Sequence, residues 1–150
     1  MPYADWAGAL QDLTQTLEEL YDGEFVILGE RHRDHRWTQL LTRRPAPARY
    51  VQVLRAGEVL FAECVGARAL GGTWVMDPST IEMMRTMGWQ TPEKSRAAPR
   101  QRTPNFELLV DLSDSEKLAA LLIASLSVLA AHPADLVLEA STAPSWAAEG

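Results

Sequence analysis

Two histidines, His32 and His35, are the side chains best suited to hold a metal ion, and the carboxylates of Glu30 and Asp34 lie beside them. Two imidazoles three residues apart share one face of a helix, whereas in a strand they point to opposite sides. The segment has no clear helical pattern, and the third histidine, His132, is far along the chain. A catalytic zinc ion usually needs three protein ligands. We therefore expect a solvated loop, and the alternative is a small metal-binding protein or metal-dependent enzyme.

The residue patterns of other common catalytic mechanisms are missing from the sequence. Cys64, the only cysteine, has no base beside it and falls on the apolar side of a predicted strand, so we expect an inert buried thiol. No serine occupies a Gly-x-Ser-x-Gly turn, and Gly71-Gly72 lacks the lysine of a phosphate-binding loop. The sequence therefore predicts a protein that is not an enzyme and that uses no cofactor.

The length and composition are those of one globular domain. The 150 residues are 47% hydrophobic and 23% charged, so we expect a single domain over 1–150, with a core from about 5 to 140 and a frayed tail at 141–150. The net charge of -6 argues against nucleic acid as a partner, because phosphate binding requires a basic surface. The longest apolar segment, 118–131, contains serines and falls short of the roughly 20 residues that span a bilayer. We expect a cytoplasmic protein without a secretion signal or a membrane partner.

Hydrophobic periodicity predicts helices and strands in a mixed order. The predicted elements are a helix at 4–21, a strand at 24–30, a hairpin at 50–65, a helix at 78–87, a strand at 105–111, a helix at 113–131 and a short terminal element at 133–140. This order predicts an α+β fold, with an antiparallel sheet of about four to five strands and helices before, between and after them, packed on one face.

Capping residues and apolar stripes set the expected ends and faces of the helices. Asp77 before Pro78 is a typical start for the second helix, and Ser113 with Glu116 predicts a capping box for the third. The apolar stripe of the first helix, which includes Tyr21, is expected in the core. The third helix is apolar on every side, which predicts burial against more than one neighbour.

The hairpin at 50–65 has two alternating strands with different faces. A turn at Ala56-Gly57 predicts three cross-strand pairs, namely Leu54 with Val59, Gln52 with Phe61, and Tyr50 with Glu63. The opposite face is small and aliphatic and suits a core beneath helices; it carries Val51, Val53, Leu60, Ala62 and Cys64. The face that carries the three cross-strand pairs is too apolar to be exposed only to solvent, which indicates that another part of the chain or a partner covers it.

Arginines gather at 31–49 and again at 94–102. Such a run is usually a solvated loop, and the alternative is a basic patch that steers an acidic partner. Trp89 follows the second helix and is expected to dock into the core. Asn105, between a proline and an aromatic residue, is expected to fix its loop through side-chain-to-backbone hydrogen bonds.

A set of short motifs resembles a known family in order and spacing. The motifs are Trp6, Tyr50-Val51-Gln52, Leu60, Ala62-Glu63, Gly66, Gly88-Trp89, Pro92, Pro104-Asn105-Phe106, Pro133 and Leu136. Over about residues 5 to 140 the chain resembles the TY-Chap or YbjN-like group of bacterial proteins, which are similar to type III secretion chaperones. The resemblance implies an α/β sandwich, often a homodimer, that holds another polypeptide; it does not imply a catalytic residue. The Arg- and His-rich segment at 31–49 departs from the family pattern.

The surface that we expect to bind a partner polypeptide is the mixed face of the hairpin. Its residues are Tyr50, Gln52, Leu54, Val59 and Phe61, which combine apolar anchors with polar groups as interfaces do. In the alternative, the terminal helix of the protein covers this face, and the domain is then structural or regulatory with no peptide groove.

Overall fold

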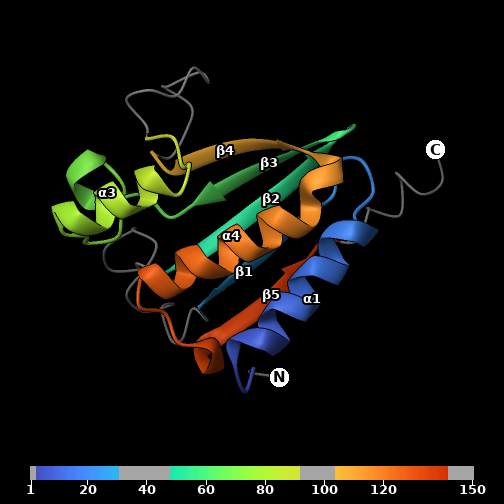
Figure 1. Ribbon diagram of the computed structural model, residues 1–150, viewed down its shortest axis with the longest axis horizontal. Coiled ribbons are helices and arrows are strands. Elements are labelled where there is room, and N and C mark those ends of the chain that lie inside the picture. The colour runs from blue at the N-terminus through green and yellow to red at the C-terminus, as the bar shows by residue number, and fades with distance from the viewer. Residues whose placement is uncertain (1–2, 31–47, 92–103, 142–150) are drawn as a thin grey trace, which may run out of the picture.

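The strands of the computed structural model form one antiparallel sheet in the order β4-β3-β2-β1-β5 (Figure 1). The strands are β1 (Phe25–Glu30), β2 (Tyr50–Ala56), β3 (Val59–Cys64), β4 (Phe106–Asp111) and β5 (Leu136–Ala140). The structure describes residues 3–30, 48–91 and 104–141. The histidines at 32 and 35, most of the arginine-rich segments and the tail beyond 141 lie outside the described residues.

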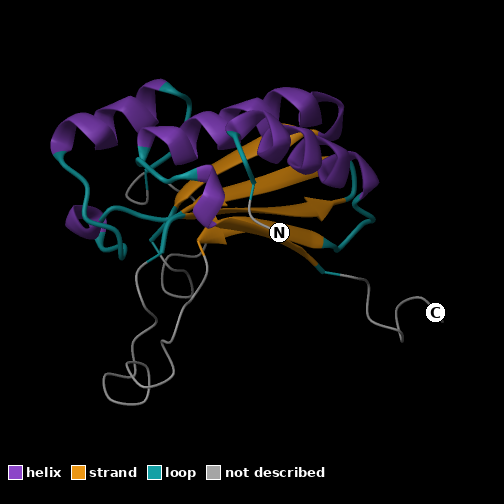
Figure 2. Ribbon diagram, turned by 90° about the horizontal axis from the view of Figure 1, so that it is seen from below, coloured by secondary structure: helices purple, strands orange, loops and turns teal. Residues whose placement is uncertain are grey.

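The helices lie together on one side of the sheet (Figure 2). They are α1 (Trp6–Glu19), α3 (Pro78–Thr86) and α4 (Ser115–Val128), with short 3-10 turns η1 (Arg68–Leu70), η4 (Leu112–Asp114) and η5 (Pro133–Asp135). Helices before, between and after the strands confirm the predicted α+β class. None of the described helices is long and apolar enough to cross a membrane.

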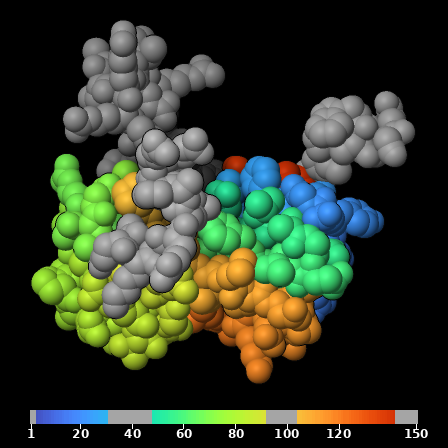
Figure 3. All heavy atoms as spheres, turned by 90° about the horizontal axis from the view of Figure 1, so that it is seen from above, coloured from blue at the N-terminus to red at the C-terminus, as the bar shows by residue number. Residues whose placement is uncertain are grey.

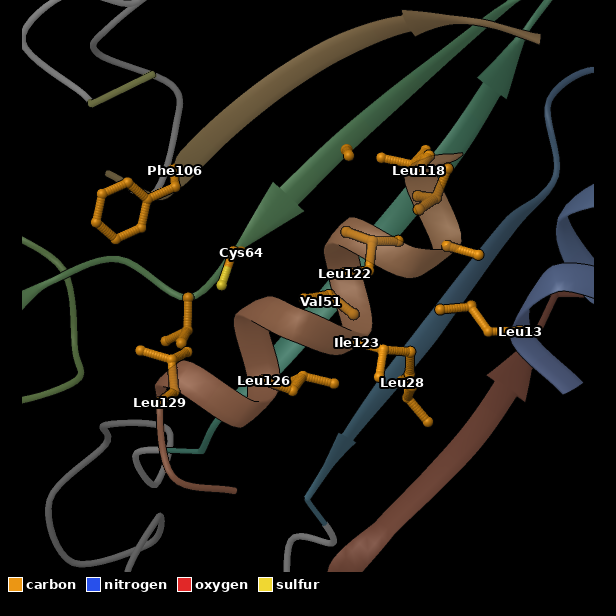
Figure 4. Packing of buried hydrophobic residues seen from close by; sticks show 14 of the residues in the cluster. Leu13, Leu28, Val51, Cys64, Phe106, Leu118, Leu122, Ile123, Leu126 and Leu129 are labelled. Atoms are coloured by element: carbon orange, nitrogen blue, oxygen red, sulfur yellow. The ribbon is translucent and has the colours of Figure 1, made fainter. Parts of the chain in front are cut away.

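Helix α4 is the centre of the core. It packs against α1, α3 and strands β2, β3 and β4, which confirms the predicted burial on several sides. In Figure 4, Leu122 and Leu126 of α4 lie over the strands that carry Val51 and Leu28. The core face of the sheet is therefore the small aliphatic one predicted from the hairpin.

The capping of α4 differs from the prediction. Ser113 lies in η4, and α4 begins two residues later, at Ser115, with Asp114 as an N-cap that makes no side-chain hydrogen bond. Asp111 caps the preceding turn, because its carboxylate accepts from the Ser113 amide at 3.0 Å. The capping-box prediction was wrong because a 3-10 turn precedes the helix, so Ser113 and Glu116 do not hold the N-cap and N3 positions.

Helix α1 confirms most of its predicted stripe. Asp5 accepts from the Gly8 amide at 2.9 Å, and Leu13 and Leu17 are buried. Tyr21 is an exception, since it is exposed. The helix ends at Glu19, so the helical spacing that placed Tyr21 on the core side no longer applies to it.

The hairpin register differs by two residues from the prediction. Leu54 pairs with Phe61 rather than with Val59, because the turn is at Gly57-Glu58. Gly57 has a φ of 64°, which suits a glycine at the first position of a two-residue hairpin turn. Because side chains alternate with a period of two, a shift of two residues leaves every side chain on its predicted face.

Residues 65–91, which follow β3, form a lobe at one end of the molecule (Figure 3, green to yellow-green). Asp77 caps α3 through the Thr80 amide at 2.8 Å, and Pro78 is the first helical residue, as predicted.

Beyond η5, the terminal element is strand β5, which pairs with β1. Strand β1 therefore lies inside the sheet, between β2 and β5.

Candidate functional site

The sheet face turned away from the helices carries a continuous row of apolar side chains. The strand register places Phe25 opposite Leu54, Leu54 opposite Phe61, and Phe61 opposite Leu109. Directly opposed residues have Cβ atoms about 4.5–5.5 Å apart, so these four side chains, which we call the apolar row, are neighbours across β1, β2, β3 and β4. Leu109 is 64% exposed, Leu54 and Phe25 are each 37% exposed, and Phe61 is half-buried.

A second row, mostly polar, lies beside the apolar row. It runs through Glu107, Glu63, Gln52, Ile27 and Glu139, each opposite the next in the register. Glu107 is buried, Glu63 and Gln52 are half-buried, and Glu139 is exposed. Glu63 and Glu107 each have an interaction partner, so neither is a free carboxylate. The two rows together give the outer face an apolar strip with an acidic and amide border.

All five side chains predicted for partner binding lie on this outer face. Leu54 and Phe61 belong to the apolar row, and Gln52 belongs to the polar row. Val59 is half-buried and pairs with Asp111 at the hairpin end of the sheet. Whether these five residues contact a partner stays a prediction.

Tyr50 is more constrained than the other predicted residues. Its hydroxyl oxygen accepts a hydrogen bond from the Asn105 side-chain nitrogen at 3.1 Å. It pairs with Gly29, where an added Cβ would stand only 2.5 Å from the Tyr50 Cβ. Burial raises the pKa of Tyr50 and the hydrogen bond from Asn105 opposes that rise. Tyr50 therefore has a clear structural role at the end of the face.

Sequence reasoning missed Phe25 and Leu109 as members of the row. The signal is present in the sequence, because Phe106, Leu108 and Val110 alternate along the predicted strand at 105–111 and share one of its sides, which sends Leu109 to the other. The register across the sheet, which no local pattern reveals, aligns Leu109 with Phe61.

No described helix covers the outer face. Helices α1 and α4 pack on the opposite side, so α4, the long helix that the alternative placed over the outer face, does not cover it (Figure 2). Leu118, Leu122 and Leu126 of α4 are all buried in the core, between α4 and the sheet. Among the described residues, the outer face is open to a partner.

Asn105 and Trp89 have the structural roles that the sequence predicts. The Asn105 side-chain oxygen accepts from the Gly66 amide at 3.1 Å in a buried position. The Trp89 ring is buried, and its indole nitrogen donates to the Ser125 hydroxyl at 2.8 Å. These contacts fix the loops at the β3 and β4 ends of the sheet.

The described residues offer no support for catalysis by metal or thiolate. They contain no group of three or more metal-ligating side chains within reach of one ion, and the histidines at 32 and 35 lie outside them. His132 makes a local hydrogen bond, in which its Nδ1 accepts from the Ala134 amide at 3.1 Å. Cys64 is fully buried, and burial raises the pKa of its thiol, which disfavours the reactive thiolate.

Comparison with known families confirms the resemblance found in the sequence. The chain matches, over residues 3–142, the family described as TY-Chap3, T3SS (YopN, CesT) and YbjN peptide-binding chaperone 3, and it belongs to that family. No curated protein and no solved structure matches the chain.

Proposed function

We propose that the protein is a non-enzymatic, chaperone-like module that holds a partner polypeptide on its outer sheet face. The observation that carries this proposal is the exposure of the apolar row, which spans four adjacent strands with no described helix over it. Membership of a family of peptide-binding chaperones supports a polypeptide as the occupant. The contact residues are those predicted from the sequence, with Phe25 and Leu109 added.

The size of the row fits reversible binding. Burying one exposed Leu or Phe side chain completely contributes about 1.5–3 kcal/mol. Phe25, Leu54 and Phe61 are already partly buried, so each contributes less than this when a partner covers it. The row then contributes a few kcal/mol, and binding in the micromolar range, about -8 kcal/mol, needs further backbone or polar contacts. Gln52 and the neighbouring polar row offer such contacts.

The protein is further proposed to act as a homodimer, as the family resemblance implies. If the outer face is the dimer contact, substitution of Phe61 by Glu should convert a dimer to a monomer. If the dimer forms elsewhere, the same substitution should leave the mass unchanged and weaken peptide binding alone. Light scattering on the wild type and on Phe61→Glu separates these two arrangements.

The proposal is tested with labelled peptides that carry Leu or Phe at alternate positions and Gln between them. Fluorescence anisotropy should show saturable binding to the wild type. Leu109→Glu should weaken binding at least tenfold, about 1.4 kcal/mol, because a carboxylate replaces the most exposed member of the row. Since Leu109 is 64% exposed, the free energy of unfolding should change by less than about 1 kcal/mol.

The matched control is Val75→Glu, which introduces the same charge at an apolar side chain that is 71% exposed and lies outside the sheet. This variant should bind the peptides as the wild type does. Equal binding by wild type, Leu109→Glu and Phe61→Glu, together with a monomeric mass throughout, would show the proposal to be wrong.

A further inference from the structure

The charged side chains that the strands place on the outer face are all carboxylates. They are Glu63, Glu107, Asp111 and Glu139. Among the described residues, the basic side chains next to these strands, Arg49 and Arg55, are engaged on the helix side of the sheet. Arg49 binds Glu30 and the carbonyls that end α4, and Arg55 donates to the Leu20 and Gly57 carbonyls.

Asp111 and Glu139 are the two of these carboxylates that are exposed to solvent. They lie on opposite edge strands, Asp111 on β4 and Glu139 on β5. Asp111 follows Leu109 by two residues on the same face of β4. Glu139 is opposite Ile27, which follows Phe25 by two residues on β1. Each end of the apolar row therefore has an exposed carboxylate close by.

The charge of Asp111 is stabilised locally. Its carboxylate accepts hydrogen bonds from the Ser113 hydroxyl and from the Ser113 amide, and these bonds lower its pKa. It is thus ionised throughout the neutral range. The whole chain, with a net charge of -6, adds a field of the same sign.

We infer that the bound polypeptide is cationic: its apolar side chains lie on the apolar row, and its lysine or arginine side chains reach Asp111 and Glu139 at the two edges of the sheet. This inference rests on the proposed function and names its class of client. Complementary charges at the rim of an interface increase the association rate and select the partner, while like charges disfavour it. An acidic segment of the same apolar pattern is therefore rejected.

Three labelled peptides with identical apolar positions and with Lys, Gln or Glu between them test the inference. The Lys peptide should bind the wild type about tenfold more tightly than the Glu peptide at low salt, with the Gln peptide between them. The difference should shrink as salt is added, because exposed charges are screened over roughly 10 Å at 0.1 M salt.

Two variants locate the effect. Glu139→Gln and Asp111→Asn should each weaken binding of the Lys peptide about two- to fivefold, as expected for an exposed ion pair, and should leave the Gln peptide unaffected. Asparagine can still accept from the Ser113 amide, so the turn before α4 is kept. The matched control is Glu18→Gln, an exposed carboxylate on α1 that removes the same charge from the helix side.

The possible results separate the inference from the proposed function. Equal binding of all three peptides overturns the inference and leaves the proposed function standing. Binding of none of them overturns the proposed function itself. In a third result, Glu18→Gln reduces the preference for the Lys peptide as much as Glu139→Gln does. The preference would then come from net charge alone, which overturns the assignment to the sheet edges.

Discussion

Arg49 and Glu30 form a two-pronged ion pair next to the end of α4. The Arg49 Nε and Nη2 atoms donate to Glu30 Oε1 at 2.9 Å and to Oε2 at 2.6 Å, and the Arg49 amide donates to Oε1 at 2.8 Å. The same guanidinium donates to the Ala130 carbonyl at 2.9 Å and lies over the Trp74 ring, 4.7 Å from its centroid. One side chain thus connects β1, the end of α4 and the loop after η1.

Substitution of Arg49 by Met should lower the free energy of unfolding by about 2–3 kcal/mol, because it leaves the Glu30 charge largely buried and unpaired. The side chains of Arg49 and Glu30 are only 20% and 18% exposed. A double-mutant cycle with Glu30→Gln, measured by urea unfolding, should give a coupling energy above about 1 kcal/mol. The Arg85–Glu82 pair is the control, since its side chains are 38% and 68% exposed and its coupling should stay below about 0.5 kcal/mol. Equal coupling in the two pairs would contradict this prediction.

The Arg49–Glu30 ion pair should make the free energy of unfolding depend on pH in the acidic range. Burial raises the pKa of Glu30, but the hydrogen bonds and charge of Arg49 outweigh burial and hold the pKa below its ordinary value of 4.5. A depressed folded-state pKa gives stability that is complete above the unfolded-state pKa and is lost as the pH falls through the folded-state pKa. The difference in unfolding free energy between wild type and Glu30→Gln should therefore be constant above about pH 5 and shrink below about pH 4. A difference that stays constant down to pH 3 would rule out this linkage.

Substitution of Gly66 by Ala should prevent stable folding or lower the unfolding free energy by more than about 3 kcal/mol. A Cβ at this position would stand 1.8 Å from the Pro104 carbonyl oxygen, and both backbones are held by the Gly66–Asn105 hydrogen bond. Gly8→Ala is the matched control, because Gly8 lies in α1 and its Cβ would meet only ordinary contacts, with the Asp5 side chain at 3.6 Å and the Tyr3 side chain at 3.7 Å. That variant should raise stability by about 0.5–1 kcal/mol. Thermal unfolding of the two proteins measures both effects, and similar melting temperatures would disprove the packing explanation.

Substitution of Ala130 by Gly should stabilise the protein by up to about 1 kcal/mol. Ala130 follows α4 with a φ of 64°, and the next amide, of Ala131, donates back to the Leu126 carbonyl at 3.0 Å. This is the helix-ending geometry in which glycine is preferred, because an L side chain is strained at positive φ. Gly88→Ala, at a φ of 114° after α3, should show the opposite change. Denaturant midpoints for both variants test the pair, and a loss of stability in Ala130→Gly would show that the backbone is not strained there.

Local patterns predicted the parts of the fold whose causes are local. The Asp77-Pro78 start of α3 follows from residues close together in sequence. The burial of Trp89 and the side-chain-to-backbone hydrogen bond of Asn105 were also predicted, but their partners, Ser125 and Gly66, lie 36 and 39 residues away. The prediction of which side chains share each face of the hairpin is also confirmed, although the predicted register was wrong. A shift of two residues leaves each side chain on the same face.

The features that the sequence did not reveal depend on contacts between distant segments. Strand β5 is recognisable as a strand only through its pairing with β1, more than a hundred residues earlier in the chain. Leu109 joins the apolar row only because β4 aligns it with Phe61. The cap of α4 was missed for a different reason, since the 3-10 turn at Leu112–Asp114 inserts a second short helix before the predicted one.

The place of β1 between β2 and β5 has a consequence for biosynthesis. The ribosome makes β1 and β2 early, but the strand that closes the other side of β1 comes only with Leu136–Ala140. Throughout most of translation, one row of β1 amide and carbonyl groups lacks its final neighbour, and an unpaired strand edge readily pairs with another chain. The nascent chain therefore carries an unpaired inner strand edge until its last strand is complete.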